Sequence, residues 1–283
     1  MRSPDPRFPS LPQAIGLVLL LLLLEVLLQG IAMLALGARL PSPAVQAGVV
    51  VAASAVVLWV ALRRRGEGPR QAFPLRPVGA PLLGAITLTI LGGTVVMSEA
   101  DNLLRSLLPP PRWLEELFEQ LLLGGQGLWA SLLLVAIVAP LTEELLFRGV
   151  VLRGFVTRYP ARRAIVLAAL LFGASHLNPW QFGSATVFGL LAGWWLVRTG
   201  SLVPCLFGHA LNNAVPAVAV HLFRVEIPGY TGALTEAVQF QPLWFDLLGL
   251  VLVSAGLGWT AGLLEKTDGE GRGGTERDRA GYS

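Results

Sequence analysis

The stretch AIGLVLLLLLLEVLLQGIAMLAL, residues 14–36, is almost unbroken Leu, Val, Ile and Ala. An α-helix needs about 20 apolar residues to cross the hydrocarbon core of a bilayer, and this run supplies them. The apolar core of a signal peptide is shorter, and no clear cleavage site follows the run. We therefore expect residues 14–36 to form a transmembrane helix.

The rest of the chain has the same character. Of its 283 residues, 54% are hydrophobic and 14% are charged, and the mean hydropathy is +0.64, outside the usual range of a soluble domain. We predict an all-α polytopic membrane protein with about eight transmembrane helices and a polar site buried in the bundle. The later helices are expected at 45–62, 82–97, from 128 through 144, 164–177, 182–197, 202–220 and 243–264.

A mixed stretch, residues 99–126, separates the third expected helix from the fourth. Pro109-Pro110-Pro111 interrupts it, and residues 113–118 have the spacing of an amphipathic helix. We expect this part of the chain to lie at the membrane surface rather than to cross the bilayer.

The arginines indicate the orientation. They concentrate in the loops that follow the second, fourth and sixth expected helices, so the positive-inside rule places both termini in the cytoplasm. Because these loops form no continuous basic face, the net charge of +3 does not indicate a nucleic-acid partner. The single cysteine, Cys205, excludes an intrachain disulfide. We expect an integral protein of a bacterial or archaeal cell membrane.

Three polar fragments interrupt the apolar runs. An ionisable side chain at the centre of a transmembrane helix costs roughly 2.5–3.5 kcal/mol on insertion scales, so these fragments need an explanation. A catalytic site buried in the bilayer supplies one. The fragments are Glu143-Glu144 with Arg148, Phe172 with His176, and His209 with Asn213.

The spacing suggests how the fragments meet. Glu143 and His176 lie equally far from the turn expected near Tyr159-Pro160, so an equal rise per residue puts them at the same depth. A carboxylate and an imidazole together can deprotonate water, and a second imidazole with an amide, His209 and Asn213, can stabilise an oxyanion. Amide hydrolysis needs these parts.

A metal mechanism is the alternative. Glu143, His176 and His209 could hold a divalent ion whose bound water attacks the substrate, and this set of ligands suits zinc. The spacing of the helical metalloprotease motif His-Glu-x-x-His is absent. The sequence does not decide between the two mechanisms.

The three fragments resemble, in order and topology, the motifs of the CPBP family of intramembrane proteases. This family includes the type II CAAX prenyl endopeptidase and bacterial abortive-infection and bacteriocin-processing relatives. The resemblance covers about 128–220. It implies that Glu143 activates water with help from His176, that His209 and Asn213 form the oxyanion site, and that Glu144 is a supporting carboxylate.

Other polar or aromatic residues have simpler explanations. Glu144 and Arg148 have the i,i+4 spacing of an intrahelical ion pair, so we expect Arg148 to be structural. Phe172 is expected to pack beside the site. Glu25, within the first helix, is assigned no role.

The sequence therefore predicts an intramembrane endopeptidase that acts on a membrane-associated or lipid-modified protein or peptide. A transporter or proton relay that uses buried Glu and His is one alternative, and a non-catalytic scaffold or bacteriocin-immunity protein is another. The expected parts are a cytoplasmic N-terminal segment (1–13), three helices with the surface segment (14–127), a catalytic core (128–220), an outer loop with the last helix (221–264) and a disordered cytoplasmic tail (265–283).

Overall fold

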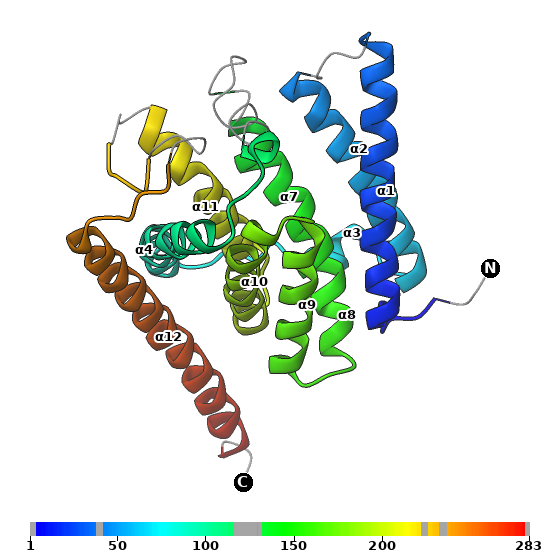
Figure 1. Ribbon diagram of the computed structural model, residues 1–283. Helices are drawn as coiled ribbons and strands as arrows, with labels where there is room; N and C mark the ends of the chain where they lie inside the picture. Colours follow the sequence, from blue (N-terminus) through cyan, green and yellow to red (C-terminus); the bar gives the residue numbers. More distant parts are fainter. Residues whose placement is uncertain are drawn as a thin grey trace.

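The computed structural model describes residues 4–37, 42–115, 129, 132–221, 226–231 and 237–280, and it gives the backbone alone for 220–221 and 266–280. All regular elements in these ranges are helical, so the predicted fold class is confirmed. The first and last helices lie at opposite sides of the bundle (Figure 1). The elements are α1 (Leu11–Ala35), α2 (Pro43–Arg65), α3 (Pro69–Ala72), α4 (Ala80–Leu107), η1 (Leu133–Val138), α7 (Ala139–Glu144), η2 (Leu145–Leu152), α8 (Arg153–Val156), α9 (Ala161–Ser175), α10 (Pro179–Thr199), α11 (Val203–His221) and α12 (Leu243–Ala280).

Within the described ranges, four helices are long and apolar enough to cross a membrane. They are α1, α2, α4 and the part of α12 over Leu243–Glu265, which match the first, second, third and eighth expected helices. This count is lower than the predicted eight. Three of the other expected helices carry the polar fragments. Two of these differ from a single long helix: α9 has only 15 residues, and the helical path before it is divided into η1, α7, η2 and α8.

The third expected helix is longer than its apolar run. It continues to Leu107, so the first part of the segment predicted to lie at the surface belongs instead to α4. The polar side chains of this part have partners, since Asn102 Nδ2 donates to Glu99 Oε2 at 3.0 Å. The helix ends just before Pro109, because a proline disfavours helical geometry in the preceding residue. Residues 116–126 of the predicted surface segment lie outside the described part of the chain.

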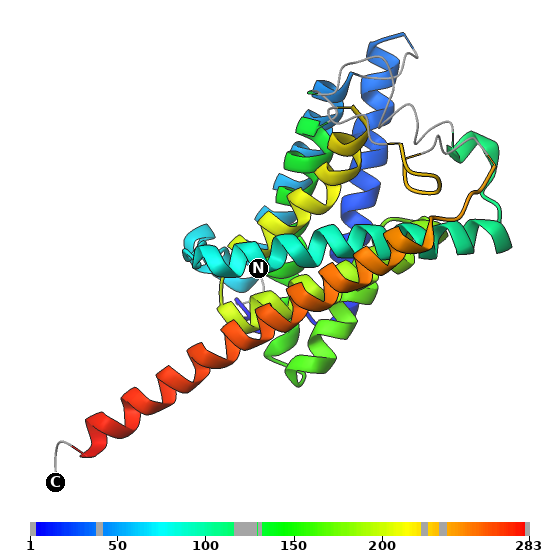
Figure 2. The same cartoon turned by 90° about the vertical axis from the view of Figure 1, so that its left-hand side faces the viewer.

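Glycines bring α4 and α12 close together. The two helices run side by side (Figure 2). A Cβ added at Gly92 would meet the backbone of Val253, and a Cβ added at Gly256 would meet the backbone of Thr89. Small residues are common at such contacts in membranes, where van der Waals packing drives helix association.

The C-terminal helix overlaps the predicted tail. The backbone of α12 is helical as far as Ala280. The sequence predicts a disordered tail from residue 265, because that segment is charged and rich in glycine. The disorder of this segment stays a prediction.

The N-terminal segment folds back onto the bundle. Arg65, only 4% exposed, donates to the carbonyl oxygens of Phe8 at 3.0 Å and of Val150 at 3.5 Å. Arg158 donates to the Arg7 carbonyl oxygen at 2.9 Å. These contacts join the segment before α1 to the end of α2, to η2 and to the turn after α8.

Replacing Gly256 with Ala should destabilise the pair of helices, because the new methyl group would lie 2.8 Å from the Ala85 carbonyl oxygen and against the Thr89 backbone. Overpacking of this kind costs about 1–3 kcal/mol. In the control Gly258→Ala, the methyl group would meet nothing within 4 Å. Thermal unfolding in detergent should give a lower Tm for Gly256→Ala only, and equal Tm values would contradict the packing.

Candidate active site

The Glu143-Glu144 pair lies on α7, a short α-helical segment between the π-helical segments η1 and η2. Such π-helical insertions are uncommon and occur frequently at functional sites. Neighbouring helical residues point about 100° apart, so the two carboxylates face different surroundings. The Glu144 side chain is 0% exposed and that of Glu143 is 28% exposed. The pair therefore supplies one carboxylate inside the bundle and one at its edge.

Glu144 is the centre of a buried charged network. Its Oε1 accepts hydrogen bonds from Arg148 Nη1 at 2.8 Å and from His209 Nδ1 at 2.7 Å. The Arg148 guanidinium also lies over the rings of Phe172 at 4.5 Å and Phe188 at 5.5 Å. The predicted Glu144–Arg148 ion pair is thus present. The His209 imidazole also binds Glu144, which the spacing did not indicate.

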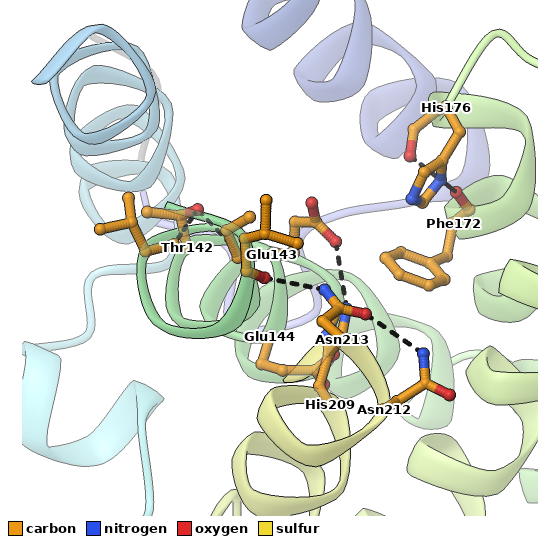
Figure 3. A network of polar contacts seen from close by, with 12 residues as sticks. Thr142, Glu143, Glu144, Phe172, His176, His209, Asn212 and Asn213 are labelled. Carbon is orange, nitrogen blue, oxygen red and sulfur yellow. Dashed lines mark hydrogen bonds and ion pairs between the residues drawn. The ribbon is translucent and has the colours of Figure 1, made fainter. Parts of the chain in front are cut away.

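The network fixes the orientation of the His209 ring. An ionised carboxylate only accepts hydrogen bonds, so Nδ1 of His209 carries the hydrogen and Nε2 faces the other way. There Nε2 lies 3.7 Å from Glu143 Oε2 (Figure 3). That oxygen is buried and accepts no hydrogen bond from the described residues. The arrangement places a carboxylate oxygen that accepts no hydrogen bond from the described residues beside an oriented imidazole.

Asn213 lies one helical turn after His209 on α11. Its Nδ2 donates to the Val135 carbonyl oxygen at 2.9 Å, and its Oδ1 accepts from Asn212 Nδ2 at 3.1 Å (Figure 3). Three of the four residues predicted to be catalytic, Glu143, His209 and Asn213, therefore come together on α7 and α11.

His176 is placed differently from the sequence-based expectation. Among the described residues, no hydrogen bond or ion pair joins it to Glu143. Its Nδ1 contacts the Phe172 carbonyl oxygen at 2.9 Å, where α9 ends. The Phe172 ring meets the imidazoles of His176 and His209 edge-on, with centroids 5.0 Å and 5.8 Å away. Phe172 therefore packs between the two histidines, as Figure 3 shows.

Some neighbours of the site were not foreseen. The Phe188 ring packs 4.6 Å from the His209 ring, but Phe188 belongs to an apolar run without a polar signal. Asn212 did carry a signal, because it is a polar residue within an apolar helix. Glu25, to which the sequence gave no role, is half-buried on α1, and its carboxylate interacts electrostatically with that of Glu143.

The residues proposed for zinc do not fit a metal ion as they are arranged. No three His, Cys, Asp or Glu side chains in the described part of the chain are grouped to hold one. His176 faces Phe172, so only Glu143 and His209 of the three proposed ligands lie side by side. The metal mechanism therefore has no support from the geometry of this site in the described part of the chain.

Residues 125–215 match the family model described as "Type II CAAX prenyl endopeptidase Rce1-like". All three polar fragments fall inside the matched residues, so the resemblance inferred from them is confirmed. Together with the apolar helices, the match indicates an integral membrane protein.

Two curated proteins are similar to parts of the chain. "Uncharacterized protein YyaK" of Bacillus subtilis (strain 168) is 29% identical over an alignment of 140 residues, and the alignment covers 45% of this chain and 46% of that protein. "CAAX prenyl protease 2" of Arabidopsis thaliana is 32% identical over an alignment of 98 residues, and the alignment covers 27% of this chain and 32% of that protein. The similarity thus spans less than half the length of each relative. No solved structure matches the chain.

Replacing Arg148 with Met should be strongly destabilising, because the buried Glu144 carboxylate would lose its cation. Breaking a buried ion pair from one side typically costs about 3–5 kcal/mol. The double variant Glu144→Gln/Arg148→Met should recover part of the lost Tm, since it removes both charges. The control is Arg162→Met, at an exposed position on α9. Thermal unfolding in detergent tests this, and a Tm like that of the control would refute the role of Arg148.

Proposed function

We propose that the chain is an intramembrane endopeptidase in which Glu143 activates the attacking water. The observation that carries the proposal is the Glu143 Oε2 atom, which is buried without a hydrogen-bond partner in the described part of the chain and lies 3.7 Å from His209 Nε2. A carboxylate in this state can accept a proton from water. The match of residues 125–215 to a CAAX endopeptidase family favours this function over a transporter or a scaffold.

The hydrolytic step needs a base for the attacking water and hydrogen-bond donors for the oxyanion. Water gives a proton to Glu143, and its oxygen bonds to the carbonyl carbon of the substrate, whose oxygen becomes negatively charged. The carbon–nitrogen bond then breaks, and the proton passes from Glu143 to the leaving nitrogen. Glu143 ends in its starting form, so atoms and charges balance without a further reactant.

The oxyanion would be stabilised from α11. His209 can donate from Nε2 when both ring nitrogens carry a hydrogen, because its Nδ1 hydrogen is already directed at Glu144. Asn213 Nδ2 has a second hydrogen besides the one that Val135 accepts. Removing one such donor from an oxyanion site typically costs 10²- to 10³-fold, at roughly 3–4 kcal/mol.

The substrate class follows from the surroundings of the site. Glu143 belongs to a helix bundle with several membrane-crossing candidates, so the bond that is cut has to reach the site from the membrane. We propose a membrane-associated or lipid-modified protein or peptide as the substrate. The relative from Arabidopsis thaliana named CAAX prenyl protease 2 supports this class.

Glu143→Gln should abolish cleavage, because an amide cannot take the proton from water. General-base catalysis contributes about 10²- to 10⁴-fold, so kcat should fall by that factor. Cleavage of a membrane-peptide library by purified protein, with Tm measured in parallel, tests this. The matched control is Glu265→Gln, an exposed position on α12. Equal kcat values for wild type and Glu143→Gln would remove Glu143 as the base.

His176→Gln tests the second group that the sequence assigned to the water. If His176 assists Glu143, kcat should fall by about 10²-fold or more in the same assay. We expect such a fall, because the His176 ring packs against Phe172 beside the site. Among the described residues, only its Nδ1 makes a hydrogen bond, so Nε2 is available to the water. A variant with the wild-type kcat would limit His176 to packing.

A further inference from the structure

Pro140 leaves one carbonyl oxygen of η1 without its helical partner. In this π-helical segment, each bond runs to the residue five positions earlier, and the Ala139 N–H bonds to the Leu134 carbonyl oxygen. The next bond in the series would join residue 140 to the Val135 oxygen. Proline has no N–H, so this bond cannot form. A carbonyl group at membrane depth needs a partner from elsewhere.

Asn213 supplies that partner. Its Nδ2 donates to the Val135 oxygen at 2.9 Å. Because a carbonyl oxygen only accepts, the NH₂ end of the Asn213 amide has to face Val135, and Oδ1 points the other way. Oδ1 in turn requires a donor, so the Asn212 amide has to present its NH₂ end, at 3.1 Å. The chemistry of the groups thus determines the orientation of both amides.

We infer that Asn212 is a positioning residue that orients the second N–H of the Asn213 amide toward the site. Pro140 makes this arrangement possible, because it leaves the Val135 oxygen free to accept from Asn213. The inference rests on the proposed function. Val135 takes one hydrogen of Nδ2 and Asn212 holds Oδ1, so the amide plane is fixed at two points. The second hydrogen of Nδ2 is left for the substrate oxyanion. Figure 3 shows the hydrogen bond by which Asn212 holds Asn213.

A purely structural role for Asn212 makes a different prediction. If Asn212 only helped α11 to pack, its replacement would affect folding and activity whether or not Asn213 were present. If it positions Asn213, its effect has to disappear when the Asn213 amide is removed. A double-mutant cycle separates these cases.

The test compares Asn212→Leu, which has a similar size and no donor, with Asn213→Ala and with the double variant. We expect Asn212→Leu to lower kcat by about 10- to 100-fold, somewhat less than loss of the donor itself, with KM unchanged. In the Asn213→Ala background, Asn212→Leu should cause no further fall. An equal fall in both backgrounds would overturn the positioning role.

Thermal unfolding of the same variants tests the contact without relying on activity. The Tm losses of Asn212→Leu and Asn213→Ala should be less than additive, and additive losses would overturn the inference. If the Tm losses are coupled but wild-type protein cleaves no peptide, the proposed function fails while the contact stands.

Pro140→Ala gives an independent check. The new N–H can bond to the Val135 oxygen and displace Asn213 Nδ2, while alanine is the better helix former. We therefore expect a lower kcat with an unchanged or higher Tm. Unchanged kcat and KM would refute the assigned role of Pro140.

Discussion

The buried charge of Glu144 is the constraint on which the site depends. A fully buried carboxylate has to be neutralised and hydrogen-bonded, and one oxygen atom of Glu144 meets both Arg148 and His209. Arg148 in turn lies over Phe172 from α9 and Phe188 from α10. The helix of the Glu pair, α9, α10 and α11 therefore meet around one ion pair. The same contact that balances the charge also orients the His209 ring.

Features encoded by nearby residues could be predicted from the sequence. Apolar runs longer than a bilayer crossing indicated the helical membrane fold, and α1, α2 and α12 lie where those runs are. The i,i+4 spacing of Glu144 and Arg148 indicated their ion pair, which the structure contains. The order of the three polar fragments indicated the family resemblance that the comparison supports. The first two signals lie within single helices, and the third is a pattern of residue types along 143–213.

Features that depend on helix winding or on distant contacts could not be predicted. Placing Glu143 level with His176 assumed an equal rise along both arms of a hairpin, but η2, which lies between Glu143 and the turn, winds differently from an α-helix. The α9 arm also ends at His176, which turns toward Phe172. The contact of Phe188 with His209 exists only once α10 and α11 are packed. These differences explain why the four catalytic candidates are not all in contact.

The docked N-terminal segment has a consequence for biogenesis. Arg65 and the residues before α1 reach their partners, Val150 and Arg158, only after those later parts of the chain have been synthesised and inserted. A segment that is synthesised before the rest of the bundle is thus among the last to find its place. A bulky fusion partner at the N-terminus would compete with this late docking. The end of α12 projects away from the bundle in Figure 1, which makes it the better attachment point for an affinity tag.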